Sequence, residues 1–325
     1  MPYDAMQHVS PSVVVPPRLV LGATSHTRQR TLRGPAECSG VGVHLGEKVT
    51  LRLLPAPEET GIVFVRTDLK NGARLIPARW DHVVDTRLCT VIGNKAGARV
   101  ATIEHLMAAL HACGIDNAFV EIDRAEVPVM DGSSDPFIFL IEMAGTVEQR
   151  APRKVIEILS TIEVVQRGKI ARLAPALESR FSFEIDFNQA PISRQRYEFT
   201  LSPETFKSEI SRARTFGFYE EVDALRKQGF ARGGSLKNAI VIKDEQVMNE
   251  GGLRYADEFV RHKLLDAVGD LSLAGASIRG HFEGYCSGHA LNNQLLHALF
   301  ADPSAWRMAA TDDTATDDAA TDDAA

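Results

Sequence analysis

Residues 258–273 read EFVRHKLLDAVGDLSL, and two patterns run through them. Apolar side chains recur at intervals of three and four residues, the spacing of an amphipathic helix. Beside that apolar stripe, His262, Asp266 and Asp270 follow one another at intervals of four, so they point to one side of the helix. An imidazole and a carboxylate one turn apart can bind one small cation, which makes His262 and Asp266 a candidate half of a metal site. A solvated polar face with a local hydrogen bond would show the same spacing, so the remaining groups must come from elsewhere.

The composition is that of an ordinary soluble globular chain. With 325 residues, of which 44% are apolar and 24% charged, the chain is long enough for two domains. Of its net charge of −7, residues 311–325 (TDDTATDDAATDDAA) contribute six Asp and no cation, which leaves −1 for the rest. A nearly neutral body favours neither a nucleic-acid nor a membrane surface. The acidic repeat of residues 309–325 cannot build a core, so we expect it to be disordered.

The cysteines and the N-terminal stretch bear on the compartment. The four cysteines are scattered and form no Cys-x-x-Cys pair, which favours free thiols in a reducing compartment, the cytoplasm. No run of about 18 apolar residues occurs, so no transmembrane segment is expected. Residues 1–28 contain an apolar patch interrupted by prolines and no early basic region. We interpret them as a loose extension and not as a signal peptide.

Strand-like stretches followed by helices occur twice along the chain. Residues 29–66 contain strands around a Gly-rich turn, and residues 100–114 predict a helix with Thr102 as its N-cap. Near residue 151 the pattern begins again with several strands, and it ends with the helix of residues 258–273 and one further helix. We therefore predict an α+β fold with two domains, residues 29–150 and 151–308.

Two further segments supply groups that a catalytic metal site needs. Glu104 and His105 are adjacent, a recurring arrangement in zinc hydrolases, in which the His binds the metal and the Glu reaches the attacking water. The signature H-E-x-x-H is absent, so the second imidazole would be His262. His289 lies on a predicted turn and is a candidate acid that Asp270 could orient. A carboxylate in the first turn of a helix also interacts favourably with the positive end of the helix dipole, which would explain Glu104 without catalysis.

Eight motifs, in the same order along the chain, resemble those of the bacterial UDP-3-O-acyl-N-acetylglucosamine deacetylases, the zinc amidases of lipid A biosynthesis. They are GVGVHLGEKVTL, DTRLCT, TIEHLMAAL, GIDN, VPVMDGSSDPF, SRARTFGF, DEFVRHKLLDAVGDL and SGHALNN. They span about residues 31–306, so only the two tails are left out, and together they are far more specific than any single pattern. The resemblance implies two domains, each a small β-sheet with helices on one face, with the helices packed together between the sheets.

The resemblance also implies a reaction and a metal site. The chain would hydrolyse the N-acetyl amide of UDP-3-O-acyl-N-acetylglucosamine to acetate and the free amine, the committed step of lipid A biosynthesis. His105, His262 and Asp266 would hold one catalytic Zn²⁺, although two imidazoles and a carboxylate also suit Fe²⁺. Glu104 would be the general base. The family also leads us to expect a monomer.

Four other residues receive roles from the same resemblance. His289 would stay protonated and assist loss of the amine, and Asp270 would orient it. Thr215 would stabilise the oxyanion. Lys263 would face the sugar and the diphosphate of the substrate.

An insert in the second domain, a βαβ unit of about residues 218–241, would form an apolar passage for the 3-O-acyl chain. The candidate lining residues are apolar and lie in or beside this insert: Phe216, Phe218, Val222, Leu225, Phe230, Ala231 and Ala239. Simple packing of a small insert would need the same kind of residues.

One position departs from the family pattern. The residue three before His289 is commonly basic in the family and is expected to contact phosphate, but here it is Cys286. Lys263, Lys169 or Arg167 would then have to supply the charge, and we take Lys169 as a candidate substrate-binding residue. A metal site on Cys286 and His289 would need two more ligands of matching spacing, and none is evident.

Two alternatives remain open at this point. A metal amidase of the same fold could act on another acylated substrate, or the chain could be a non-catalytic module that binds a nucleotide sugar or lipid. Glu104 and His289 argue against the second alternative, because binding alone needs neither a base nor an acid. The acyl chain length and the native metal are not indicated by the sequence.

Overall fold

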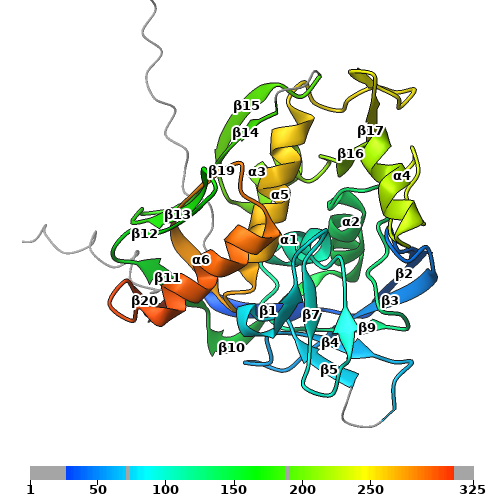
Figure 1. Ribbon diagram of the computed structural model, residues 1–325. Helices are drawn as coiled ribbons and strands as arrows, with labels where there is room; N and C mark the ends of the chain where they lie inside the picture. Colours follow the sequence, from blue (N-terminus) through cyan, green and yellow to red (C-terminus); the bar gives the residue numbers. More distant parts are fainter. Residues whose placement is uncertain (1–26, 71–73, 188–190, 311–325) are drawn as a thin grey trace, which may run out of the picture.

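The computed structural model describes residues 27–70, 74–187 and 191–310 (Figure 1). Most of the expected N-terminal extension and residues 311–325 of the acidic tail lie outside the described residues. The described helices are α1 Glu104–Ala112, α2 Asp135–Ala144, α3 Pro203–Thr205, α4 Tyr219–Lys227, α5 Glu258–Ser272 and α6 His289–Ala301, with a 3-10 turn at Trp80–His82 and a π-helical turn at Phe206–Ile210.

The first half of the chain forms a five-stranded sheet and two smaller ones. The five strands are, in spatial order, β2 Ala36–Val41, β3 Lys48–Pro55, β9 Ala118–Ile122, β4 Ile62–Arg66 and β5 Leu75–Pro77. A three-stranded sheet contains β6 Val83–Asp85, β7 Val91–Gly93 and β8 Arg99–Val100, and β1 Arg28–Leu32 pairs with β10 Thr146–Pro152. In β3, Val49, Leu51 and Leu53 alternate into the core, which is the period-2 pattern of a sheet with one buried face.

The second half forms a seven-stranded sheet. Its strands are β12 Ile162–Gln166, β13 Lys169–Ala174, β19 Ser277–Tyr285, β11 Lys154–Ile158 and β20 Trp306–Ala310, with β14 Ser179–Asp186 pairing β19 and β15 Arg194–Thr200 pairing β14. Strand β20 continues to Ala310, two residues beyond the expected end of the second domain at residue 308. A separate sheet joins β16 Phe216–Phe218, β17 Ile240–Lys243 and β18 Gln246–Val247. Because β16 and β17 are parallel and α4 connects them, this unit is the predicted βαβ insert.

The longer helices lie between the two large sheets, which confirms the predicted α+β class (Figure 1). Helix α5 packs on α1, on α6 and on strands β14 and β15, so it is covered on all sides. Thirteen of its 15 residues are buried, including His262, Asp266 and Asp270. The alternative of a solvated polar face is therefore wrong. Within the described residues, no helix is both long and apolar enough to cross a membrane.

The predicted N-cap of α1 is also wrong. The helix begins at Glu104, and Thr102 has a φ of +58°, a left-handed backbone conformation. The Thr102 hydroxyl donates to Glu126 Oε1 at 3.0 Å, so a tertiary contact takes the side chain that a cap would need. This turn brings Glu104 and His105 to the end of α1 that faces α5.

Candidate metal and catalytic site

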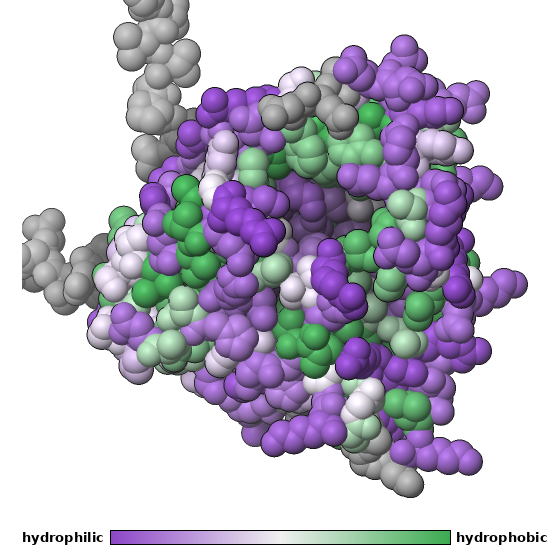
Figure 2. Space-filling view, in the orientation of Figure 1, coloured by the Kyte–Doolittle hydropathy of each residue, from purple (hydrophilic) through white to green (hydrophobic). Residues whose placement is uncertain are grey.

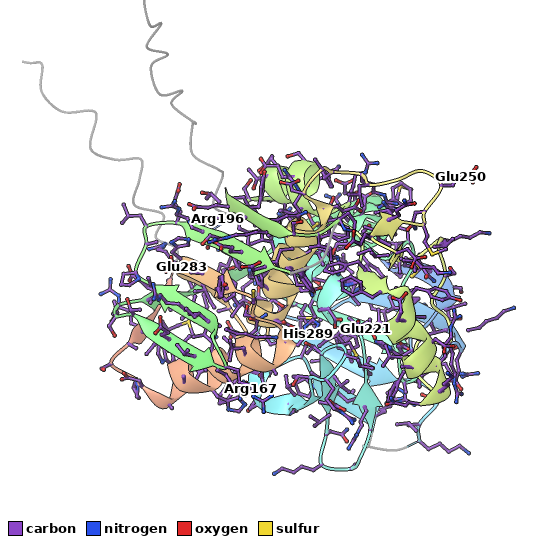
Figure 3. The ribbon with its side chains drawn as sticks, turned by 45° about the horizontal axis from the view of Figure 1, so that its top comes forward. Arg167, Arg196, Glu221, Glu250, Glu283 and His289 are labelled. Carbon is purple, nitrogen blue, oxygen red and sulfur yellow. The ribbon has the colours of Figure 1, made fainter. Side chains whose placement is uncertain are left out.

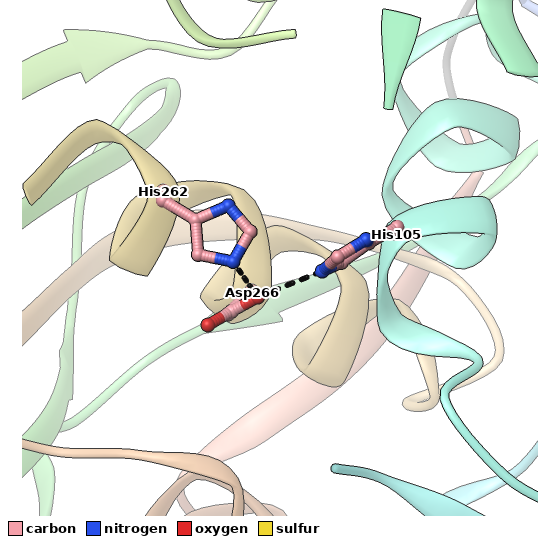
Figure 4. A group of neighbouring side chains, drawn as sticks. All are labelled: His105, His262 and Asp266. Carbon is pink, nitrogen blue, oxygen red and sulfur yellow. Dashed lines mark ion pairs between the residues drawn. The ribbon is translucent and has the colours of Figure 1, made fainter. Parts of the chain in front are cut away.

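His105, His262 and Asp266 lie together between α1 and α5 (Figure 4). One ligand atom of each residue lies within 4.8 Å of the others, and all three residues are buried. Asp266 Oδ1 is 3.3 Å from His262 Nε2 and 3.7 Å from His105 Nε2. The two imidazoles come from different halves of the chain, and the packing of α1 on α5 brings them together.

Asp266 Oδ1 is a buried carboxylate oxygen without a hydrogen-bond partner among the described residues. The other oxygen of Asp266, Oδ2, accepts from Lys263 Nζ at 2.6 Å. A buried carboxylate oxygen that accepts no hydrogen bond lowers the stability of the fold. An oxygen that faces two imidazole nitrogens instead suits a divalent cation. The donor set of two nitrogens and one oxygen therefore fits a metal ion such as Zn²⁺ or Fe²⁺.

The surroundings of the two imidazoles favour their neutral, ligating form. Burial lowers the pKa of His105 to about 3, helped by the neighbouring His262. Burial also lowers the pKa of His262, against the opposing attraction of Asp266. His262 Nδ1 is 3.0 Å from the carbonyl oxygen of Ala213, which fixes the ring so that Nε2 faces Asp266. Ser134 Oγ donates to the His105 carbonyl at 2.8 Å and holds the first turn of α1.

Glu104 is next to this group and is 4% exposed. Its Oε2 accepts the backbone N–H of Thr90 at 3.1 Å, and its Oε1 is 4.0 Å from His289 Nε2. Burial raises the pKa of Glu104 to about 7, although the charge of His289 opposes the shift. A carboxyl group whose pKa is near neutrality is suited to accept and release a proton.

His289 and Asp270 form a hydrogen-bonded pair opposite Glu104. His289 Nδ1 donates to Asp270 Oδ2 at 2.9 Å, and Asn292 Nδ2 donates to the same oxygen at 2.9 Å. Burial alone would lower the pKa of His289, but the charge and hydrogen bond of Asp270 raise it to about 9. The imidazole is thus cationic at neutral pH and its Nε2 is directed at Glu104.

Lys263 and Thr215 lie beside the candidate metal group. Burial would lower the pKa of Lys263, but the attraction of Asp266 outweighs it and raises the pKa, so the ammonium group stays charged. Its Nζ is also 5.7 Å from the centre of the Phe216 ring. Thr215 lies two residues after Ala213. Its N–H donates to Gly132 and its carbonyl accepts from Ile240, both at 2.8 Å, which anchors the segment.

The surface is hollowed over the region where α5, α6 and the insert lie in the same view of the ribbon (Figure 1 and Figure 2). Figure 2 shows this hollow with hydrophilic residues at its base and hydrophobic residues along much of its rim. The expected apolar residues lie on the insert side, and most are only half-buried: Phe216, Phe218, Val222, Leu225, Phe230 and Ala239, with Ala231 buried. Helix α4 has no buried residue, although its apolar side chains occupy one face.

Lys169 is the first residue of β13, which lies between β12 and β19 in the seven-stranded sheet. The alternation of β13 places it on the same face as the buried Ala171 and Leu173, the side on which α6 packs. Strand β13 pairs with β19 in the register Ile170↔Tyr285, and Cys286 follows Tyr285 directly. Within the part of the chain that the structure describes, the side chain of Lys169 forms no hydrogen bond or ion pair. Figure 3 shows Arg167 at the tip of the same hairpin, below His289 in that view.

Several contributors to the site had no role in the sequence-based prediction. Thr90, Asn292 and Ala213 lie in the motifs DTRLCT, SGHALNN and SRARTFGF, yet only their three-dimensional contacts reveal what they hold. His44, in GVGVHLGEKVTL, lies with its ring 6.2 Å from that of Phe230. Burial lowers the pKa of His44, Glu126 opposes this shift, and the charge of His289 adds to it, so His44 lies near the same site.

Comparisons with known proteins agree over most of the chain. A family model with the description "LpxC: UDP-3-O-acyl N-acetylglycosamine deacetylase" matches residues 29–301. A UDP-3-O-acyl-N-acetylglucosamine deacetylase of Chromohalobacter salexigens is 51% identical over 288 residues, 88% of this chain and 94% of that protein. A protein of the same name from Shewanella sp. (strain ANA-3) is 48% identical over 284 residues, 87% and 92% of the two chains. Another, from Phenylobacterium zucineum, is 49% identical over 280 residues, 86% and 96% of the two chains.

Proposed function

Because the chain belongs to the UDP-3-O-acyl N-acetylglycosamine deacetylase family, we propose that it removes the N-acetyl group of UDP-3-O-acyl-N-acetylglucosamine by hydrolysis. The products are acetate and UDP-3-O-acyl-glucosamine, in lipid A biosynthesis. The observation that carries this proposal is the 4.0 Å separation of Glu104 Oε1 and His289 Nε2 directly beside the His105, His262 and Asp266 group. A base, an acid and a metal-binding group at one point are what amide hydrolysis requires.

The metal ion would be held by His105, His262 and Asp266, and we favour Zn²⁺ over Fe²⁺. When bound, such an ion polarises the amide carbonyl and lowers the pKa of an attacking water toward about 7. The protein's own contribution is to hold the three ligands in place. Lys263 Nζ donates to Asp266 Oδ2, and the Ala213 carbonyl lies within hydrogen-bond distance of His262 Nδ1. Asp266 Oδ1 and His262 Nε2 are therefore left to bind the ion.

Glu104 takes the proton from the attacking water. Its burial keeps the pKa near neutrality, so the carboxylate accepts a proton readily and can release it again within one turnover. The N–H of Thr90 holds one carboxylate oxygen and leaves the other directed at His289.

His289 donates the proton that the leaving amine needs. Asp270 keeps the imidazole protonated and fixes its orientation through Nδ1, so that Nε2 faces the reaction centre. Expulsion of an unprotonated amine is unfavourable, and the proton from Nε2 removes that barrier.

Thr215 and Lys263 stabilise the substrate and the developing negative charge. The Thr215 hydroxyl would donate to the oxyanion, because its segment is anchored next to the carbonyl that holds His262. Lys263 carries a charged ammonium group beside Asp266, where it would face the sugar and diphosphate.

The insert would receive the acyl chain. Its candidate lining residues, Phe216, Phe218, Val222, Phe230, Ala231 and Ala239, lie in or beside the βαβ unit, and most are only half-buried. An apolar face that the protein itself does not cover is suited to an aliphatic chain. Lys169 precedes Ile170, which pairs with Tyr285, the residue before Cys286, so Lys169 would take over the phosphate contact of the usual basic residue.

The free cysteines, Cys38, Cys89, Cys113 and Cys286, suit a reducing compartment, so we place the protein in the cytoplasm, as a monomer. Sedimentation would test the second point, since a mass of twice the 35.6 kDa chain would contradict it.

The test of the function is acetate release from UDP-3-O-acyl-N-acetylglucosamine by chelator-treated protein, before and after one equivalent of Zn²⁺ is returned. Activity that disappears and returns supports substrate, reaction and metal together. Metal uptake without acetate release would contradict the substrate and leave the metal site standing. Acetate release that the chelator does not affect would contradict the metal site. Returning Fe²⁺ in a parallel sample compares the two metals.

A further inference from the structure

We propose that Thr90 is a positioning residue that joins the base and the acid's carboxylate into one hydrogen-bonded unit across the two halves of the chain. The inference rests on the proposed function, because it assigns Thr90 through Glu104 and Asp270. Thr90 itself touches neither the candidate metal group nor the hollow in any contact that the structure records.

Thr90 makes one hydrogen bond to each of these carboxylates. Its backbone N–H donates to Glu104 Oε2 at 3.1 Å, and its hydroxyl donates to Asp270 Oδ1 at 2.6 Å. The residue is 2% exposed, so water does not compete for either bond. Glu104 belongs to the first half of the chain and Asp270 to the second, so a single residue bridges the interface.

The position of Thr90 is itself fixed. It directly precedes β7, and its carbonyl accepts the N–H of Ile103, the residue before α1, at 3.4 Å. Thr90 and the base are therefore tied to the same helix end. A shift of α5 relative to α1 would stretch the bond between Thr90 and Asp270.

Asp270 depends on Thr90 for one of its two oxygens. Oδ2 accepts from His289 and Asn292, whereas Thr90 is the donor to Oδ1 among the described residues. Without the hydroxyl, Oδ1 would be a buried anionic oxygen without a donor, and the carboxylate would rotate toward another one. The imidazole of His289 would move with it, away from its 4.0 Å alignment with Glu104.

A neutral donor suits this position better than a cation would. Glu104 and Asp270 are both buried carboxylates, and each has an oxygen within 4.0 Å of a ring nitrogen of His289. A cation placed between Glu104 and Asp270 would neutralise both and weaken the hold of Asp270 on the His289 charge. Thr90 satisfies two oxygens by hydrogen bonds and adds no charge.

The alternative is that Thr90 is a β-branched residue that only packs in the interior. Thr31 provides a matched control for that alternative. It is also buried, and its hydroxyl donates to the Asn117 carbonyl at 2.7 Å and accepts from the Ala56 N–H at 2.9 Å. It lies in β1, among contacts that include none of the site residues.

The experiment compares Thr90→Val, Thr90→Ser and Thr31→Val as metal-loaded full-length proteins. Thr90→Val keeps the shape and the backbone N–H to Glu104 and removes only the hydroxyl. We expect its kcat to fall about 10- to 100-fold, with KM within about twofold and metal content unchanged. Thr90→Ser restores the donor and should recover kcat to within about threefold. Thr31→Val should keep the wild-type kcat even where its Tm falls.

A second readout does not depend on activity. The Nδ1 proton of His289, held between the ring and Asp270, gives a proton NMR signal that reports the geometry of that bond. Thr90→Val should shift or broaden this signal, and Thr31→Val should not. A Thr90→Val protein with wild-type kcat and an unchanged signal would overturn the proposal, and so would a Thr90→Ser protein as impaired as Thr90→Val. If the wild-type protein releases no acetate, the proposed function fails, while the NMR comparison still decides the role of Thr90.

Discussion

Gly269 of α5 lies against Glu104 of α1 so closely that a β-carbon on the glycine would be 2.1 Å from the Glu104 carbonyl oxygen. The two helices cross at this contact, and the candidate ligands lie on either side of it. The close approach of α1 and α5, and with it the spacing of the proposed base and ligands, therefore depends on the absence of a side chain at Gly269.

Replacing Gly269 with Ala should push α1 and α5 apart. We expect a loss of about 1–3 kcal/mol in the free energy of unfolding and weaker metal binding, because overpacking displaces His105 from His262. Helix propensity alone predicts the opposite, a gain of about 1 kcal/mol. Gly34→Ala is the control, since nothing lies within 4 Å of a β-carbon there. Urea unfolding measures the stability and metal titration measures the affinity for the ion. A Gly269→Ala protein that is more stable than wild type would contradict the expected overpacking between α1 and α5.

Glu104→Gln should remove the base and keep the ligands. The amide has the shape of the carboxylate but accepts no proton, so kcat should fall about 10²- to 10⁴-fold while the metal content stays at the wild-type level. Acetate release and metal analysis on the same sample measure the two quantities. Unchanged turnover would show that another group accepts the proton.

His262→Ala should abolish metal binding, because it removes one of three ligands and leaves Asp266 beside one imidazole. We expect the bound metal to fall from about one ion per chain to a small fraction of that. His111→Ala is the control on α1, since the His111 ring forms no hydrogen bond among the described residues and lies outside the candidate group. Equal metal content in wild type and His262→Ala would rule out the proposed ligand set.

Asp270→Asn should move the alkaline side of the pH–activity profile to lower pH. His289 acts as an acid only while protonated, so activity falls as the pH rises through its pKa. Burial lowers this pKa, but the negative charge of Asp270 overcomes burial and raises it to about 9. Without that charge the pKa drops, and the decline in kcat/KM should begin about one pH unit lower or more. If Asp270→Asn keeps the alkaline limb of the wild-type profile, Asp270 does not set the pKa of the acid that this limb reports.

Lys169→Ala should weaken substrate binding without slowing the chemical step. Loss of a diphosphate contact predicts a KM higher by about threefold to tenfold and an unchanged kcat. Arg172→Ala removes a cation from the other face of the same strand, where Arg172 pairs with Glu163 and Glu283, and should leave KM unchanged. Cys286→Lys in the Lys169→Ala background should lower KM again. An equal rise of KM in Lys169→Ala and Arg172→Ala would contradict a specific contact of Lys169 and indicate that only the net charge of this surface matters.

The sequence predicted the parts of the site that depend on local spacing. His262, Asp266 and Asp270 are separated by four residues, so any helix over this stretch aligns them, and the structure has that helix. These polar side chains resembled a solvated face, because the packing of one sheet and two helices around α5 is not encoded in the stretch itself. Spacing could only offer His262 as a partner for His105, and the family resemblance joined them, since their contact depends on how the two halves pack.

Two other features were beyond local reasoning for different reasons. Thr102 has the identity and position of a helix cap, but a hydrogen bond to Glu126 holds it in a left-handed conformation. Thr90 contributes a backbone N–H to Glu104, and every residue except proline carries that group, so no sequence pattern reveals it.

The division of the ligands between the two halves has a consequence for how the protein is made. During synthesis His105 leaves the ribosome more than 150 residues before His262 and Asp266. A nascent chain that ends before α5 holds only one of the three proposed ligands, so it would not retain the ion. Metal uptake would then be coupled to the docking of α5 on α1 and would report that this docking has taken place. The ion would add its binding free energy only to finished molecules and would leave truncated or misdocked chains less stable and open to proteolysis.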